Sequence, residues 1–166
     1  MVLHIKKNKE LTLQAYNDSD WAGYKETRRS TTGFCTQLGE NLISWSAKRQ
    51  PTVAKSSTEA EYRALTAAAQ EVTWLSALLK DLNIIHQYQS TLIHCDNLSA
   101  VYLSTKPALH NRSKHFDTDF HYIREQVALG LIETLHISAQ DQLADIFIKP
   151  LGRRPFVELR SKLGVA

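Results

Sequence analysis

Residues 33–47, GFCTQLGENLISWSA, decide the fold, because two short strand-like runs flank the sequence Gly39-Glu40-Asn41. A glycine followed by polar residues between such runs is typical of a tight hairpin turn, so residues 33–38 and 42–47 are predicted to be antiparallel strands. Just upstream, residues 11–18 alternate apolar and polar side chains and predict a further strand. The first part of the chain is therefore expected to form a meander of three antiparallel strands.

Downstream of the hairpin, the spacing of apolar residues changes from two to about 3.6, which predicts a long helix over residues 57–82 with Ser57 or Thr58 as its N-cap. Two more apolar runs predict buried strands at residues 91–96 and 131–137. Further helices are expected at residues 97–104, 116–130, 141–148 and 155–163. A strand that follows a crossover helix returns parallel to its predecessor. We therefore expect an α/β fold with a five-stranded mixed sheet, in which three antiparallel strands are followed by two parallel crossovers. Helices flank this sheet, and its first strand lies beside its fourth.

The composition is that of one ordinary globular domain, with 166 residues, 43% of them hydrophobic and 22% charged, and a net charge of +3. That small positive charge does not by itself indicate a nucleic-acid-binding surface. The two cysteines, Cys35 and Cys95, lie in apolar segments and are expected to be buried free thiols. No spacing of cysteines and histidines is typical of a zinc site, and no apolar run is long enough to cross a membrane. Four aromatic residues are predicted to lie in the core: Phe34, Trp45, Trp74 and Phe120.

Four carboxylates are predicted to meet at one edge of the sheet. Asp18 and Asp96 end the two strands expected to be parallel neighbours, and ligand sites form beyond the carboxyl ends of such strands. Glu61 falls on the sheet-facing stripe of the long helix, and Asp145 lies on the short helix after the fifth strand. Clustered carboxylates need a cation, and hard oxygen ligands suit two Mg²⁺ or Mn²⁺ ions, which predicts phosphodiester hydrolysis leaving a 5′-phosphate. Asp20 is an alternative to Asp18, since it would face the same side of the strand.

The motifs around these carboxylates resemble the ribonuclease H (RNase H) domain of copia-type LTR retrotransposons. They occur in order along nearly the whole chain: YNDSDWAG at 16–23, RSTTG at 29–33, SWSAKRQ at 44–50, SSTEAEY at 56–62, CDNLSA at 95–100, KHFD at 114–117 and QLADIFIKPL at 142–151. The resemblance places the four conserved carboxylates of that family on Asp18, Glu61, Asp96 and Asp145, and so favours Asp18 over Asp20. It implies a two-metal endoribonuclease that cuts the RNA strand of RNA/DNA hybrids during reverse transcription, beside a reverse transcriptase domain in a Pol polyprotein.

The same resemblance implies substrate contacts. Ser57, Thr58 and Asn97 flank the carboxylates and are candidates for contacts to RNA hydroxyls or the backbone, against simple helix-capping and strand-ending roles. Five basic residues are candidates for contacts to phosphates, against a role as solvated surface charges: Arg28, Arg29, Lys48, Arg49 and Lys114. The loop histidine of many RNases H has no counterpart before Asp145. His115, or alternatively His136, is a candidate for proton transfer or product release, against an ordinary surface or core role.

The expected organisation is a lead-in or linker from an upstream polymerase region at residues 1–10, the RNase H domain at residues 11–150, and a C-terminal helix or tail at residues 151–166. The expected location is the cytoplasm, in a retrotransposon particle, with the nucleus as the alternative. Two other functions stay open: an inactive or domesticated domain that binds nucleic acid or protein, and an RNase H-fold nuclease that cuts DNA. The four intact acidic positions argue against the first, and the copia-type motifs around Asp18 and Glu61 argue against the second.

Overall fold

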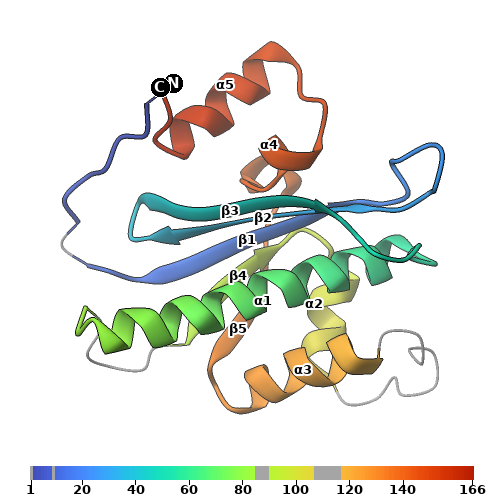
Figure 1. The fold of residues 1–166 in the computed structure, drawn as a ribbon, viewed down its shortest axis with the longest axis horizontal. Helices are drawn as coiled ribbons and strands as arrows, with labels where there is room; N and C mark the ends of the chain where they lie inside the picture. Colours follow the sequence, from blue (N-terminus) through green and yellow to red (C-terminus); the bar gives the residue numbers. More distant parts are fainter. Residues whose placement is uncertain (1, 9, 85–89, 107–116) are drawn as a thin grey trace.

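The structure, a computed structural model, describes residues 2–8, 10–84, 90–106 and 117–166, and its centre is a five-stranded sheet (Figure 1). β1 (Leu13–Asp20), β2 (Thr31–Leu38) and β3 (Asn41–Arg49) form an antiparallel meander. β4 (Thr91–Cys95) and β5 (Ile132–His136) follow as parallel strands, and the strand order is β3-β2-β1-β4-β5. The predicted mixed sheet, with its first and fourth strands side by side, is therefore confirmed.

Helices cover both faces of this sheet. α1 (Ser57–Asp81) crosses one face together with α2 (Leu98–Thr105) and α3 (Asp117–Ala128), whereas α4 (Asp145–Ile148) and α5 (Arg153–Lys162) lie on the opposite face (Figure 1). α1 packs against β1, β2 and β4 because residues at helical spacing give it an apolar stripe. That stripe contains Leu65, Ala68, Val72, Leu75 and Leu79, all buried. In the described part of the chain, no helix combines the length and apolar character needed to cross a bilayer.

Each face of the sheet has its own apolar core. The larger core lies under α1, α2 and α3 and includes Ala15, Leu65, Ile93, Phe120 and Ile123. The smaller core lies under α4 and α5 and is formed by Cys35, Leu42, Leu143, Leu159 and Leu163. Both cysteines are buried and free, as the sequence predicted.

Several predicted boundaries were wrong. β1 continues past Asp18 to Asp20, and β4 ends at Cys95 rather than at Asp96. The N-cap of α1 is Ser56, not Ser57 or Thr58, because the side chain of Ser56 accepts a hydrogen bond from the backbone N–H of Glu59 at 3.1 Å.

The helix predicted at residues 141–148 is also shorter than expected. It is reduced to the four residues of α4, after a short 3-10 turn at Ala139–Asp141. The segment between them is held in another conformation by Gln142. The Gln142 side chain donates a hydrogen bond to the backbone carbonyl of Asn17 at 2.8 Å and accepts one from the N–H of Ala144 at 3.2 Å.

Trp45 and Trp74 are not core residues, since they are 57% and 59% exposed. Trp45 lies opposite Cys35 on β3, which is an edge strand and has a neighbouring strand on one side only. Trp74 lies on the side of α1 that the helical turn directs away from the sheet-facing stripe. Phe34 packs against the larger core and Phe120 is fully buried, so these two predictions are confirmed.

The two ends of the described chain lie side by side (Figure 1). Val2 and Ala166 exchange two backbone hydrogen bonds, at 3.0 and 2.9 Å, and Leu3 forms an antiparallel bridge with Val165. Residues 2–4 are therefore paired with residues 164–166, and α5 contributes to the smaller core.

Candidate active site

Asp18 and Asp96 are neighbours because two parallel strands are paired just before them. Asn17 of β1 lies opposite Cys95 of β4, so the residues that follow, Asp18 and Asp96, emerge side by side. Asp18 is buried and Asp96 is partly exposed. The strand register therefore creates this pair, although Asp18 is not the last residue of its strand.

Asp145 reaches the same place because α4 packs closely on the sheet beside Asp18. Gly33 of β2 pairs with Asp18, and a Cβ atom at Gly33 would lie 2.6 Å from Cγ2 of Ile148 in α4. A side chain at position 33 would therefore push α4 away from the sheet. The fully buried Gln142 anchors the start of this segment to β1 through its hydrogen bond to Asn17.

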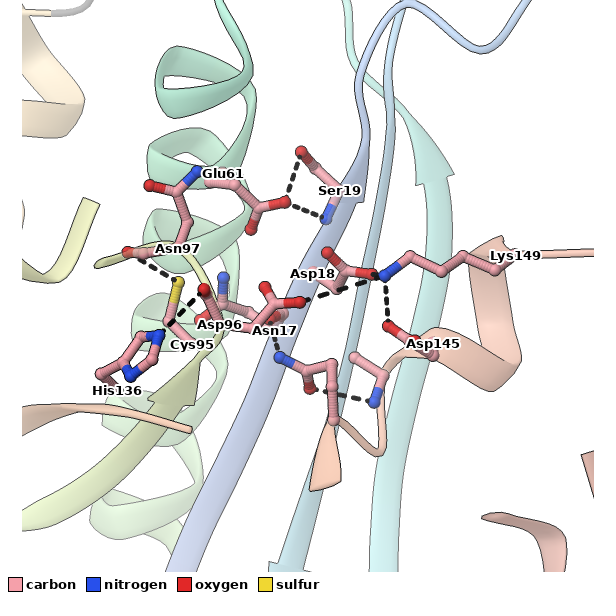
Figure 2. Close-up of polar contacts among 12 residues, drawn as sticks. Asn17, Asp18, Ser19, Glu61, Cys95, Asp96, Asn97, His136, Asp145 and Lys149 are labelled. Atoms are coloured by element: carbon pink, nitrogen blue, oxygen red, sulfur yellow. Dashed lines mark hydrogen bonds and ion pairs between the residues drawn. The ribbon is translucent and has the colours of Figure 1, made fainter. Parts of the chain in front are cut away.

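Glu61 comes from α1, on the other side of β1. The backbone N–H and the hydroxyl of Ser19 both donate to Oε1 of Glu61, at 2.9 and 3.1 Å (Figure 2). The other oxygen, Oε2, is buried and has no hydrogen-bond donor among the described residues. A buried carboxylate oxygen is costly without a partner, so this environment is the one expected of a cation ligand.

Glu59 is buried as well but has a different role. Its two oxygens accept hydrogen bonds from the guanidinium of Arg63 at 2.7 Å and from the backbone N–H of Lys55 at 2.9 Å. Glu59 therefore belongs to the N-terminal cap of α1, and Glu61 is the carboxylate that faces the sheet edge.

The acidic side chains form two overlapping groups that share Asp96 (Figure 2). Asp18, Asp96 and Asp145 each offer an oxygen within 4.8 Å of the others, and Glu61, Cys95 and Asp96 form a second group by the same measure. The carboxylates supply hard oxygen ligands, which Mg²⁺ and Mn²⁺ prefer. The residues present therefore fit divalent cations.

Burial raises the pKa of each of these carboxyl groups, because desolvation penalises the charged form. The pKa of Asp18 is raised from 3.8 to about 6 and that of Glu61 from 4.5 to about 7. Burial likewise raises the pKa of Asp145 to about 6, and it raises the pKa of Asp96. The cluster therefore resists carrying its full negative charge unless a cation is close by.

One cation of the chain itself lies in this cluster. Nζ of Lys149 is 2.7 Å from Oδ2 of Asp18, 2.7 Å from Oδ1 of Asp145 and 4.0 Å from Oδ2 of Asp96 (Figure 2). Lys149 and Gln142 belong to the motif at residues 142–151, but the sequence alone predicted no role for either. The available signal for Lys149 was its spacing, because it follows Asp145 by four residues and helical residues four apart are neighbours.

Candidate contacts to RNA hydroxyls lie beside the cluster. Ser57 is exposed and Thr58 is half-buried at the start of α1. Asn97 follows Asp96 directly and is the N-cap of α2, where its side chain accepts a hydrogen bond from the N–H of Ala100 at 3.0 Å. Asn97 therefore caps α2, a role that the sequence did not predict, and its amide NH₂ is left able to donate elsewhere.

Candidate contacts to phosphates lie at the same end of the sheet. Lys48 and Arg49 are exposed at the end of β3, and the strand pairing places them level with Ser19 and Asp20, two strands away. Arg49 also packs its guanidinium 3.6 Å from the centre of the Tyr24 ring.

Arg28 and Arg29 are exposed in the connection between β1 and β2. Lys114 and His115 lie outside the described residues. Nε2 of His136 lies 3.2 Å from the backbone carbonyl of Asp96, at the end of β5. Asp20, the alternative to Asp18, lies beside Gly23 and joins neither acidic group of the described residues.

The sheet order, the helices on both of its faces and the acidic edge define a class, the RNase H-like fold. The chain superposes on an RNase H1 isolated from compost by a metagenomic approach, LC11-RNase H1, with a TM-score of 0.61 and 15% identity over 82% of this chain and 92% of that one. The same enzyme in complex with an RNA/DNA hybrid gives a TM-score of 0.55 at 15% identity, over 82% and 94% of the two chains. The prototype foamy virus protease-reverse transcriptase gives 0.55 at 11% identity, over 98% of this chain and 22% of that one. At these identities the likeness shows the fold alone.

Sequence relatives narrow this class. The chain is 45% identical over 163 residues to the retrovirus-related Pol polyprotein from transposon RE1 of Arabidopsis thaliana, covering 98% of this chain and 11% of that polyprotein. It is 37% identical over 153 residues to the corresponding polyprotein from transposon TNT 1-94 of Nicotiana tabacum, covering 92% and 11%. No model of a protein family matches the chain. These relatives are copia-type retrovirus-related Pol polyproteins, and the chain spans about 11% of their length.

Proposed function

We propose that this chain is the RNase H domain of a copia-type retrotransposon Pol polyprotein and that it hydrolyses the RNA strand of RNA/DNA hybrids during reverse transcription. The observation that carries the proposal is the convergence of Asp18, Asp96 and Asp145, with Glu61 beside them, at one edge of a sheet with the RNase H-like fold. The Pol polyprotein relatives and the hybrid complex of a protein with the same fold support the same assignment.

In this proposal the four carboxylates hold two Mg²⁺ or Mn²⁺ ions. Such ions, when bound, activate a water and stabilise the leaving oxygen of a phosphodiester, leaving a 5′-phosphate. The protein contributes by fixing its own oxygens before substrate arrives. Ser19 orients Glu61 through two hydrogen bonds, while Gly33 and Gln142 bring Asp145 next to Asp18.

The proposal assigns recognition of the hybrid to the basic and polar candidates that the sequence indicated. Lys48 and Arg49 lie two strand spacings from β1, or roughly 10 Å, which suits contacts to phosphates that flank the scissile one. Arg28, Arg29 and Lys114 are proposed for the same purpose. Ser57, Thr58 and Asn97 are proposed for contacts to the RNA hydroxyls, and His115 for proton transfer or product release.

The proposed setting is a polyprotein in which residues 1–10 lead in from a polymerase region, residues 11–150 form the RNase H domain, and residues 151–166 add a C-terminal helix that packs on that domain. The neighbouring reverse transcriptase domain is the proposed protein partner. The proposed location is the cytoplasm, in a retrotransposon particle, with the nucleus as the alternative.

The test is a cleavage assay with three labelled substrates: an RNA/DNA hybrid, duplex RNA and duplex DNA, each with Mn²⁺ or with EDTA. We expect metal-dependent cutting of the RNA strand of the hybrid alone. Asp96→Asn should lower this rate by at least about 100-fold, because even partners of metal ligands commonly contribute 10–100-fold.

The matched control is Asp81→Asn, which makes the same chemical change at the exposed end of α1, roughly 30 Å along the helix from Glu61. It should cut at the wild-type rate. Equal cutting of duplex DNA would favour a DNA nuclease of this fold. No cutting of any substrate would favour an inactive or domesticated binding domain.

A further inference from the structure

Lys149 places its ammonium among the same oxygens that the proposed function gives to a divalent cation. It pairs at 2.7 Å with Asp18 and Asp145 and lies 4.0 Å from Asp96. These three residues are one of the two groups of described side chains whose ligand atoms all lie within 4.8 Å of one another. The lysine is therefore central to the group rather than at its rim (Figure 2).

An ammonium at this position and a divalent cation compete for the same carboxylate oxygens. Mg²⁺ sits about 2.0–2.1 Å from its oxygen ligands, so an ion bound by these carboxylates would be within a few ångströms of Nζ. Two positive charges at such a distance repel strongly in a partly buried site. Binding of the divalent ion therefore requires that Nζ move out.

The side chain of Lys149 can move away from the carboxylates while its backbone and the carboxylates keep their positions. Its side chain is 36% exposed and ends a flexible four-carbon stem. Its backbone is held, because its N–H donates to the carbonyl of Asp145 at 2.9 Å and its carbonyl accepts from the N–H of Leu151 at 2.9 Å. α4 is also packed against Gly33, so Asp145 keeps its place when the ammonium departs.

We propose that Lys149 is a built-in counter-ion that offsets part of the negative charge of Asp18, Asp96 and Asp145 in the metal-free protein and that a divalent cation displaces. This inference rests on the proposed function, because it takes the carboxylates to be metal ligands. Lys149 is thus a positioning residue: it reduces the repulsion among the acidic side chains before metal arrives, and by competing for them it weakens the affinity for the metal.

The test is the dissociation constant for Mn²⁺, measured by calorimetry without nucleic acid. Lys149→Met should bind Mn²⁺ about tenfold more tightly than the wild type, since a competing ligand of the site is gone. Lys25→Met, in the exposed turn after β1, removes the same charge and should leave the dissociation constant unchanged. If the role of Lys149 were purely structural, Lys149→Met would bind Mn²⁺ more weakly than the wild type, because its carboxylates would be disordered.

A second measurement uses the wild-type protein and so does not depend on how the variant folds. Lysines are acylated briefly with an amine-reactive reagent in EDTA or in Mn²⁺, and the products are read by mass spectrometry. Lys149 should react several-fold faster in Mn²⁺, and Lys25 equally in both. Equal or slower reaction of Lys149 in Mn²⁺ would overturn the inference.

The outcomes separate this inference from the proposed function. If the wild type binds Mn²⁺ and cuts the hybrid, but Lys149→Met binds Mn²⁺ no more tightly, only the counter-ion role fails. If neither protein binds Mn²⁺ and the hybrid is not cut, the proposed function fails and this inference fails with it.

Discussion

Asp18 and Glu61 bind protons more tightly in the folded protein than in the unfolded chain. Burial raises the pKa of Asp18 to about 6 and that of Glu61 to about 7, from 3.8 and 4.5. Below about pH 3 both groups are protonated in either state, and the stabilisation from the raised pKa values is fully present. As the pH rises through 6 and 7 the folded protein must ionise buried groups, and this stabilisation is lost.

The metal-free protein should therefore be less stable at pH 8 than at pH 5. The measurement is the melting temperature in EDTA across this range. Glu61→Gln removes one of the titrating groups, so its melting temperature should depend less on pH, whereas Asp81→Asn should follow the wild type. A wild-type melting temperature that rises from pH 5 to pH 8 would contradict the assignment of these pKa shifts to burial.

At the scale of single residues, the sequence could identify side chains whose position follows from the helical periodicity of apolar residues. Glu61 was separated from Glu59 because it continues the apolar stripe of α1, and the structure places it toward the sheet edge. Lys149 and Gln142 could not be assigned in this way. Their roles depend on contacts with Asp18 and Asn17, more than a hundred residues away, and no local pattern encodes such contacts.

At the scale of elements, the cap of α1 gives a prediction that separates two neighbouring serines. Ser56→Ala should lower the free energy of unfolding by about 1 kcal/mol, because it removes the hydrogen bond to the N–H of Glu59. Ser57→Ala should change it by less than about 0.5 kcal/mol, as expected for an exposed position without a capping bond. Urea unfolding of both variants measures the difference. A larger loss of unfolding free energy for Ser57→Ala than for Ser56→Ala would instead indicate that Ser57 is the N-cap, as the sequence predicted.

The types and order of the helices and strands were predictable from the sequence. Which of their faces are packed against another element was not. The hairpin at Gly39 and the change of period after β3 are local signals, and they were enough to predict the sheet. Periodicity also shows which side of a strand or helix is apolar. It does not show whether another element lies on that side, and this is why Trp45 on the edge strand β3 was wrongly placed in the core.

At the scale of the whole molecule, α5 is part of the folded body. Leu159 is 7% exposed in the smaller core, so Leu159→Ala should lower the free energy of unfolding by about 2–3 kcal/mol through the cavity it leaves. Val157→Ala, two residues away and 43% exposed, should cost less than about 1 kcal/mol. Denaturant unfolding compares the two. Equal, small losses of unfolding free energy in the two variants would mean that α5 does not contribute to the stability of the domain.

The hydrogen bonds between Val2 and Ala166 mean that the chain enters and leaves the body at a single corner (Figure 1). Sequence joined before residue 2 and sequence joined after residue 166 would start from the same spot, however far apart those residues are along the chain. Domain insertion into a loop of a host protein and circular permutation should thus both be tolerated without removing a strand from the sheet. In a polyprotein, the segments before and after such a module would therefore lie next to each other.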